Sequence, residues 1–202
     1  MALHPEPLPT VAEVYDLPGP EQGHWTYKDY AGLPDDGKHY EIMNGFLLMP
    51  PSPNGFHQDI ILEIASYLRV HINLTGLGLV RIAPFDVELA PDVVVQPDVL
   101  VVLKAHFQRI TDNRLVGAPD LVVEVASPGT ATYDRNHKYR AYARAGVQEY
   151  WIVDPEARTV EVLILAGQKY QSSGLYRGQT VLSSRLVPAL RVPVEQFFKQ
   201  VL

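Results

Sequence analysis

Two short runs of valine and leucine, each with a carboxylate residue, constrain the possible folds of this chain most. They are QPDVLVVL at 96–103 and PDLVVEVA at 119–126. Nearly continuous runs of this kind are typical of central strands covered on both faces. Asp98 stands at the start of the first run, and Glu124 lies inside the second. Because an unpaired carboxylate in such a place loses its hydration, each must have a hydrogen-bonded partner, a cation or a metal.

The segments around these runs predict one α/β domain. Asn44 and Gly45 separate two β-prone runs at 40–49, which is typical of a type I′ hairpin turn. Apolar residues at three- and four-residue spacing predict a helix from His57 to about Asn73. Further strands are expected at 79–89 and 149–154, a hairpin at 159–165 and 168–173, and helices at 27–32, 132–145 and 193–200. Gly146 is a favoured end for the helix at 132–145.

This order of elements indicates a mixed β-sheet core flanked by helices, with an N-terminal hairpin and a C-terminal hairpin. Residues 1–23 are acidic, rich in proline and aperiodic, so they are predicted to be a flexible lead-in to a single domain at 24–202. The N-terminus lacks the pattern of a secretory signal, and no apolar stretch reaches membrane-spanning length. We therefore expect no membrane association and a cytoplasmic location.

Composition and charge exclude several classes of functional site. The chain has no cysteine, which excludes thiol nucleophiles, iron–sulfur clusters and cysteine-based zinc sites. The net charge is −6, but residues 1–41 hold two lysines against eight acidic residues, so the remainder is neutral. Within it, 104–144 is modestly basic, which indicates either a nucleic-acid surface or simply a solvated helix face. No HExxH pair, glycine-rich phosphate loop or GxSxG turn is present.

The predicted helix at 132–145 places a lysine on its inner face. Asp134, Lys138, Ala141, Tyr142 and Ala145 share one stripe, while the other polar residues lie on a separate face. A lysine that faces the sheet needs an anion, either Glu124 or a bound phosphate. Two alternatives remain: the lysine amine extends to water along its packed stem, and Glu124 pairs with an arginine at a strand end.

Three further residues are candidates for substrate binding. His57 opens its helix, where it contacts a phosphate or water or is a surface residue without a role. Ser127 follows Glu124 and either donates to it or to a metal-bound water, or ends the strand with Pro128. Arg135 lies in the basic region. Asp120 repeats the Pro–Asp pair and is equally suited to starting its strand.

Several motifs, in order, resemble the Uma-two family of the PD-(D/E)xK restriction-endonuclease-like superfamily. They are YEIMNG at 40–45, PPSPNGFHQDI at 50–60, APFDVEL at 83–89, QPDVLVV at 96–102, GAPDLVVEVASPGT at 117–130 and DRNHKYRAYARAGVQEYWIVDP at 134–155. The resemblance covers roughly residues 24–190. It implies a metal-dependent phosphodiesterase site on a mixed sheet flanked by helices.

The family's acidic positions fall on Glu41, Asp98 and Glu124, with Asp98 after Pro97 as the superfamily motif requires. Ala126 stands where the lysine of the ExK tripeptide is expected. The resemblance implies that Lys138, on the following helix, takes its place. A second departure is Phe46, because many relatives carry an acidic residue after the hairpin glycine.

The resemblance, with these residues, implies a Mg²⁺- or Mn²⁺-dependent endonuclease that acts on DNA. Asp98, Glu124 and the backbone carbonyl of Val125 would hold the metal, and Lys138 would orient the attacking water or stabilise charge. Glu41 would hold a second metal or a metal-bound water. The alternative is a nuclease-like module without turnover that binds nucleic acid or a protein. A homodimer is expected, because duplex cleavage by one site per chain calls for two subunits. The strand at Tyr150–Trp151, with the C-terminal hairpin, is expected to offer the apolar surface.

Overall fold

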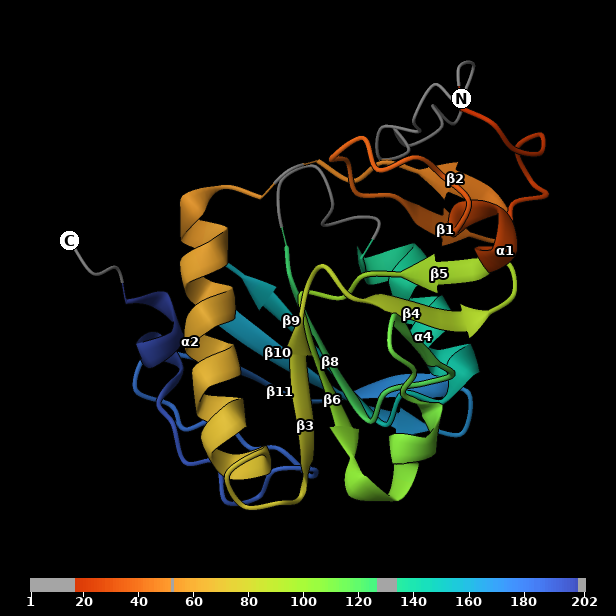
Figure 1. Ribbon diagram of the computed structural model, residues 1–202. Coiled ribbons are helices and arrows are strands. Elements are labelled where there is room, and N and C mark those ends of the chain that lie inside the picture. Colours follow the sequence, from red (N-terminus) through yellow and green to blue (C-terminus); the bar gives the residue numbers. More distant parts are fainter. Residues whose placement is uncertain (1–16, 52, 127–133, 200–202) are drawn as a thin grey trace, which may run out of the picture.

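The computed structural model describes residues 17–51, 53–126 and 134–199, and its strands form two mixed sheets (Figure 1). The larger sheet has six strands in the order β11-β10-β9-β8-β6-β3. Their bounds are β3 Gly78–Ile82, β6 Val99–Leu103, β8 Leu121–Val125, β9 Glu149–Asp154, β10 Thr159–Ala166 and β11 Lys169–Arg177. The two valine-rich runs form strands inside this sheet, as predicted, and the structure shows that these strands, β6 and β8, are neighbours.

The smaller sheet has five strands in the order β2-β1-β5-β4-β7. Their bounds are β1 Glu41–Met43, β2 Phe46–Leu48, β4 Asp86–Ala90, β5 Val93–Val95 and β7 Arg114–Val116. The mixed α/β architecture is confirmed, and its strands are divided between two sheets. The predicted strand at 79–89 is in fact two strands, β3 and β4, one in each sheet, and Pro84 between them has no N–H for a ladder.

The predicted hairpin turn is confirmed. Asn44 and Gly45 have positive φ angles of 52° and 78°, as a type I′ turn requires. A Cβ at Gly45 would lie 2.4 Å from the carbonyl oxygen of Gly23, so only glycine fits this approach. Gln22 donates to Leu47 O and accepts from Leu47 N. Residues 17–23, assigned to the lead-in from sequence, therefore contact the hairpin, and residues 1–16 lie outside the described residues.

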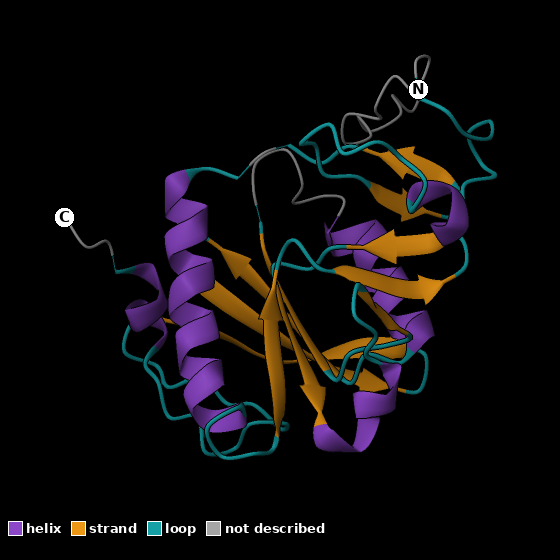
Figure 2. Ribbon diagram, viewed as in Figure 1, coloured by secondary structure: helices purple, strands orange, loops and turns teal. Residues whose placement is uncertain are grey.

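Two helices cover opposite faces of the six-stranded sheet (Figure 2). Helix α2, Gly55–Ile72, begins where the Asn54 side chain accepts from His57 N, and its apolar stripe packs on Val99, Val123 and their neighbours. A π-helical turn, η3 (Asp134–Lys138), leads into α4, Tyr139–Ala145, which ends at Gly146 with φ 92°. Helix α4 packs on the residues that alternate with those beneath α2, because successive strand side chains point to opposite faces.

The remaining elements are short. Helix α1 spans Tyr27–Tyr30, and the 3₁₀ helices are η2 Lys104–Arg109 and η4 Val194–Phe198. The last replaces the longer helix expected at 193–200. Tyr150 and Trp151 are fully buried. The expectation that this aromatic strand offers apolar surface to a second subunit is therefore wrong. Among the described residues, no helix is long and apolar enough to span a membrane.

Candidate active site

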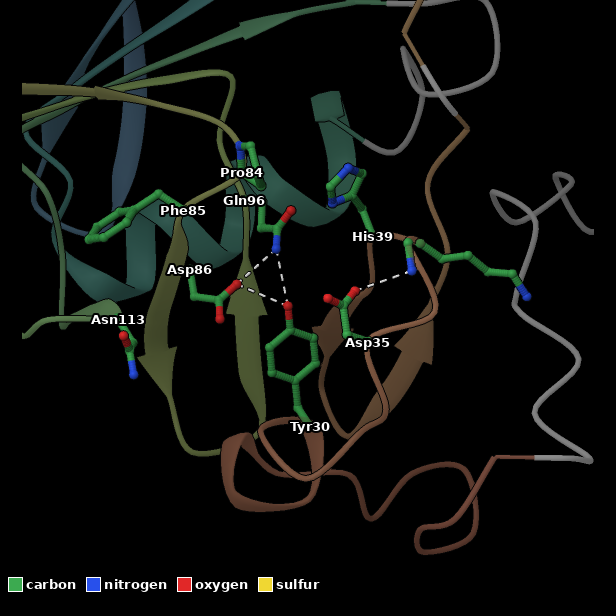
Figure 3. Close-up of a pocket in the computed structure, with 10 residues that line it drawn as sticks. Tyr30, Asp35, His39, Pro84, Phe85, Asp86, Gln96 and Asn113 are labelled. Atoms are coloured by element: carbon green, nitrogen blue, oxygen red, sulfur yellow. Dashed lines mark hydrogen bonds between the residues drawn. The ribbon is translucent and has the colours of Figure 1, made fainter.

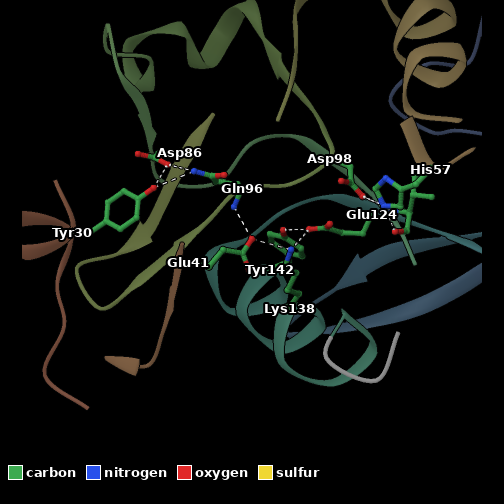
Figure 4. A network of polar contacts seen from close by, with 10 residues as sticks. Tyr30, Glu41, His57, Asp86, Gln96, Asp98, Glu124, Lys138 and Tyr142 are labelled. Atoms are coloured by element: carbon green, nitrogen blue, oxygen red, sulfur yellow. Dashed lines mark hydrogen bonds and ion pairs between the residues drawn. The ribbon is translucent and has the colours of Figure 1, made fainter. Parts of the chain in front are cut away.

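Three residues from three elements meet between the two sheets (Figure 4). Lys138, at the end of η3, places its Nζ 3.0 Å from Oε1 of Glu41 on β1 and 3.0 Å from Oε1 of Glu124 on β8. All three side chains are buried. The alternative in which Lys138 extends to water is therefore wrong. The amine instead joins a carboxylate of the smaller sheet to a carboxylate of the larger one.

Glu124 occupies the middle of the larger sheet, where β8 runs parallel to β9 and antiparallel to β6. It faces α4, as the predicted alternation requires. The Tyr142 hydroxyl, one turn beyond Lys138, donates to Oε1 of Glu124 over 2.5 Å. Burial, with the nearby Glu124 charge, raises the pKa of Tyr142, so the hydroxyl stays protonated and acts as a donor. Glu124 thus forms its ion pair with Lys138, in the helical segment that follows β8. The alternative from the sequence was an arginine at a strand end.

Asp98 lies beside this cluster, just before β6. Its Oδ2 accepts a hydrogen bond of 2.7 Å from Val125 N at the end of β8. Burial raises the pKa of Asp98, and the His57 charge works in the opposite direction. The nearby Lys138 and Glu41 also influence this carboxyl. The four residues of the predicted site are therefore brought together, while their catalytic roles stay predictions.

His57 is a buried part of the same site, so the surface interpretation is wrong. Its Nε2 lies 2.7 Å from the carbonyl oxygen of Val125 and 3.5 Å from Oδ2 of Asp98. Its position was detectable from sequence, because His57 is in helical phase with Ile60 and Ile64 on the apolar stripe of α2. The histidine contacts two of the three protein groups predicted to hold a metal, the Val125 carbonyl and the Asp98 carboxylate.

Gln96 is a member of the site that sequence reasoning missed. Its backbone N–H donates to Oε1 of Glu41 over 2.9 Å, and its side chain reaches away toward Tyr30 and Asp86. Gln96 stands two positions before Asp98, so one short segment supports two of the acidic residues. The motif QPDVLVV begins at this residue but does not indicate the contact, because the backbone N–H makes it.

The other candidates are placed elsewhere. Arg135 forms an exposed ion pair of 3.0 Å with Glu161 on β10, so it does not contact the cluster. Ser127 lies outside the described residues. Asp120 is buried, and its carboxylate contacts Leu103 N and the ring of His106. These contacts give the buried carboxylate a structural role. Phe46 is exposed on the hairpin.

The donor atoms at this site suit a small hard cation. The described residues contain no cluster of three or more His, Asp or Glu side chains arranged to hold a metal ion by themselves. Mg²⁺, however, usually keeps several waters and needs only one or two carboxylates. Asp98 and Glu124 offer two, and the Val125 carbonyl directly follows Glu124 in the chain. Oε2 of Glu41 is buried and has no hydrogen-bond partner among the described residues. An orphaned buried carboxylate oxygen is the atom that a cation or its water would satisfy.

Comparison with known proteins shows the family and the fold of this chain. The family model Uma2, described as "Putative restriction endonuclease", matches residues 27–195. No curated protein matches the chain. Among solved structures, the chain is similar to a crystal structure of a "putative nuclease belonging to DUF820" from Anabaena variabilis ATCC 29413. The TM-score is 0.73 with 18% sequence identity, covering 86% of this chain and 97% of the other. That likeness shows the shared fold, and the match over most of the sequence shows that this chain belongs to the Uma2 family.

Proposed function

We propose that this protein is a divalent-metal-dependent endonuclease that hydrolyses phosphodiester bonds in DNA. The single observation that carries the proposal is the buried set in which Lys138 contacts Glu41 and Glu124 beside Asp98. Membership of a family described as restriction endonucleases supports a nuclease. Desolvating three carboxylates and one amine together costs more than a plain apolar core would, which favours a functional reason for the set.

The chain's own groups suit the parts of such a reaction. Asp98, Glu124 and the Val125 carbonyl would hold Mg²⁺ or Mn²⁺, which supplies a water of lowered pKa and neutralises charge on the phosphate. Lys138 carries an ammonium that cannot ligate a metal, so its role would be to orient the water or stabilise the developing negative charge. Glu41, through its unpartnered Oε2, would hold a second metal or a metal-bound water. His57 keeps the Val125 carbonyl and the Asp98 carboxylate in place.

The experiment measures metal uptake and cleavage on the same preparations. Calorimetric titration with Mg²⁺ and Mn²⁺ is expected to show binding to the wild type and none to Asp98→Asn. Cleavage of plasmid and linear DNA is expected to require the metal and to fall about a hundred- to a thousand-fold in Lys138→Ala, with metal affinity nearly intact. Lys169→Ala, an exposed lysine on β11, is the matched control. Full cleavage by folded Lys138→Ala would refute its assignment.

The alternative is a nuclease-like module that binds nucleic acid or protein without turnover. The observation that favours it is the closure of the site by its own ion pairs, since Lys138 already contacts two carboxylates. A wild-type protein that takes up no metal and cleaves no DNA, yet binds DNA, would establish this alternative. Fold alone does not separate the two.

A homodimer and a cytoplasmic location belong to the same proposal, because duplex cleavage by one site per chain needs two subunits and a DNA substrate places the enzyme where DNA is. With the aromatic strand buried, the surface that supports dimerisation is the outer side of α2 and the turn after it. Leu62, Val70, Leu74 and Leu77 are more than half exposed there. A monomeric mass in light scattering at micromolar concentration would refute the dimer.

A further inference from the structure

A hollow of about 350 Å³ lies beside the catalytic cluster, between the hairpin segment before β1 and the start of β4 (Figure 3). Its size is at the lower end of ligand sites. It is separate from the contacts among Glu41, Glu124 and Lys138, but Gln96 belongs to both places. The Gln96 side chain lines the hollow, while its backbone N–H donates to Glu41. A ligand in the hollow would therefore be a near neighbour of the reacting phosphate.

The floor of the hollow is a fixed hydrogen-bonded triad. Oδ1 of Asp86 accepts from the Tyr30 hydroxyl over 2.9 Å and from Nε2 of Gln96 over 2.8 Å. Burial, together with the Asp86 charge, raises the pKa of Tyr30, so its hydroxyl stays a donor. Both donors thus point at one carboxylate oxygen. The triad leaves the other oxygen, Oδ2 of Asp86, without a hydrogen bond to any described residue.

The atoms offered to a ligand include several acceptors. Besides Oδ2 of Asp86, the amide oxygen of Gln96 accepts no hydrogen bond from the described residues. A second carboxylate, that of Asp35, lines the wall. Lys38, His39 and Asn113 line the hollow as well, and the Lys38 Nζ lies 3.6 Å from the carboxylate of Asp36. The Tyr30 side chain adds apolar surface. Two carboxylates repel a phosphate, whereas they favour a group with N–H donors and a flat apolar face.

We propose that this hollow receives an unpaired nucleobase of the DNA substrate, one that bears an exocyclic amino group donating to Asp86. Adenine, cytosine and guanine carry such a group, whereas thymine has none. Stacking on an aromatic side chain and a hydrogen bond to a fixed acceptor are the usual contacts of an unpaired base with protein. The inference rests on the proposed DNA substrate and deepens it, because it names a preference for the base next to the cleaved bond.

The test measures binding without cleavage. Fluorescence anisotropy in EDTA compares short labelled oligonucleotides of deoxyadenosine, deoxycytidine and thymidine. Wild type is expected to bind the first two about tenfold more tightly than thymidine, as a hydrogen bond to a charged acceptor implies. In Asp86→Asn, the Tyr30 and Gln96 donors keep the amide oxygen at the Oδ1 position, so the amide N–H₂ takes the place of Oδ2. That variant is expected to prefer thymidine.

Asp92→Asn, an exposed carboxylate outside the hollow, has the same change in charge and is expected to keep the wild-type preference. Asp86→Ala is expected to lose the preference without reversing it, and circular dichroism confirms that each variant is folded. Equal binding of the three oligonucleotides by wild type, no binding of any, or an unchanged order in Asp86→Asn would overturn the inference. Cleavage without base preference would refute this inference and leave the proposed endonuclease standing. Base-selective binding without cleavage in Mg²⁺ would refute the proposed endonuclease and leave this inference standing.

Discussion

Lys138 and Glu124, 14 positions apart in the chain, form a buried ion pair with 3.0 Å between Nζ and Oε1. The same ammonium lies equally close to Glu41. A buried pair broken from one side leaves an uncompensated charge, which is far more costly than removing both partners. The pair therefore has consequences for stability that can be measured apart from any activity.

Replacing Lys138 with methionine is expected to lower the free energy of unfolding by about 3–5 kcal/mol, because two carboxylates lose their cation. Urea denaturation measures the change. Lys169→Met removes an exposed lysine and is expected to change stability by less than about 0.5 kcal/mol. A Lys138→Met protein as stable as wild type would contradict the buried ion pair.

The double variant Glu124→Gln with Lys138→Met tests the pairing itself. It is expected to be less destabilised than the sum of its single variants, with a coupling free energy of about 1–3 kcal/mol, since the two residues are in contact. Activity is expected to be absent from the double variant even where stability returns. Strict additivity of the two single effects would show that the residues act independently.

Tyr142→Phe removes a hydroxyl that donates to the Glu124 carboxylate over 2.5 Å. A hydrogen bond to a charged group contributes about 1.5–3 kcal/mol, so the unfolding free energy is expected to fall by that amount. Tyr139→Phe is the matched control, because its hydroxyl donates to the neutral carbonyl of Tyr170 over 3.0 Å. Its expected cost is about 0.5–1.5 kcal/mol. Equal losses in both variants would speak against a charged Glu124.

Asp98→Asn is expected to stabilise the protein at neutral pH. Burial raises the pKa of Asp98, so the folded state holds this proton more tightly than the unfolded state does. Its charge consequently opposes folding as the pH rises above the ordinary carboxyl pKa of about 4. Asparagine keeps an acceptor for Val125 N and has no charge to bury.

The expected gain at pH 7 is about 1 kcal/mol, or a rise in Tm of about 2–4 °C for a chain of this size. The gain should shrink as the pH falls to 4 and below, because the aspartate is protonated in both states once the pH lies under the ordinary carboxyl pKa. Calorimetric melting across this range measures it, with the exposed Asp112→Asn as control. A gain that grows on acidification would contradict the direction of the pKa shift.

Glu149→Gln tests how the C-terminal segment is attached. The buried Glu149 carboxylate accepts from Nε1 of Trp151 over 2.7 Å, Arg185 N over 2.9 Å and Leu186 N over 3.2 Å. Because an amide turns one acceptor oxygen into a donor, the variant is expected to lose about 1.5–3 kcal/mol.

Hydrogen exchange at the Arg185 and Leu186 amides should accelerate in this variant. The exposed Glu156→Gln is the control and is expected to leave both amides protected. Unchanged exchange at these amides in Glu149→Gln would show that other contacts hold the segment.

Short-range patterns in the sequence determined several features of this structure. The hairpin turn needs only the positive φ angles that Asn44 and Gly45 tolerate, and the stripes of α2 and α4 follow from helical period. Alternation along β8 placed Glu124 on the face toward Lys138 without any knowledge of the partner strands. These features depend on residues close together in the chain, so their physics is readable from the sequence.

Only the tertiary structure decided the rest. The division of 79–89 between two sheets depends on pairing with β6 on one side and with β5 and β7 on the other. The meeting of Glu41 with Lys138, and of His57 with the Val125 carbonyl, joins segments that are far apart in sequence. Such contacts arise from how whole elements pack, and the Gln96 backbone N–H that holds Glu41 is common to almost every residue, so no residue pattern announces it.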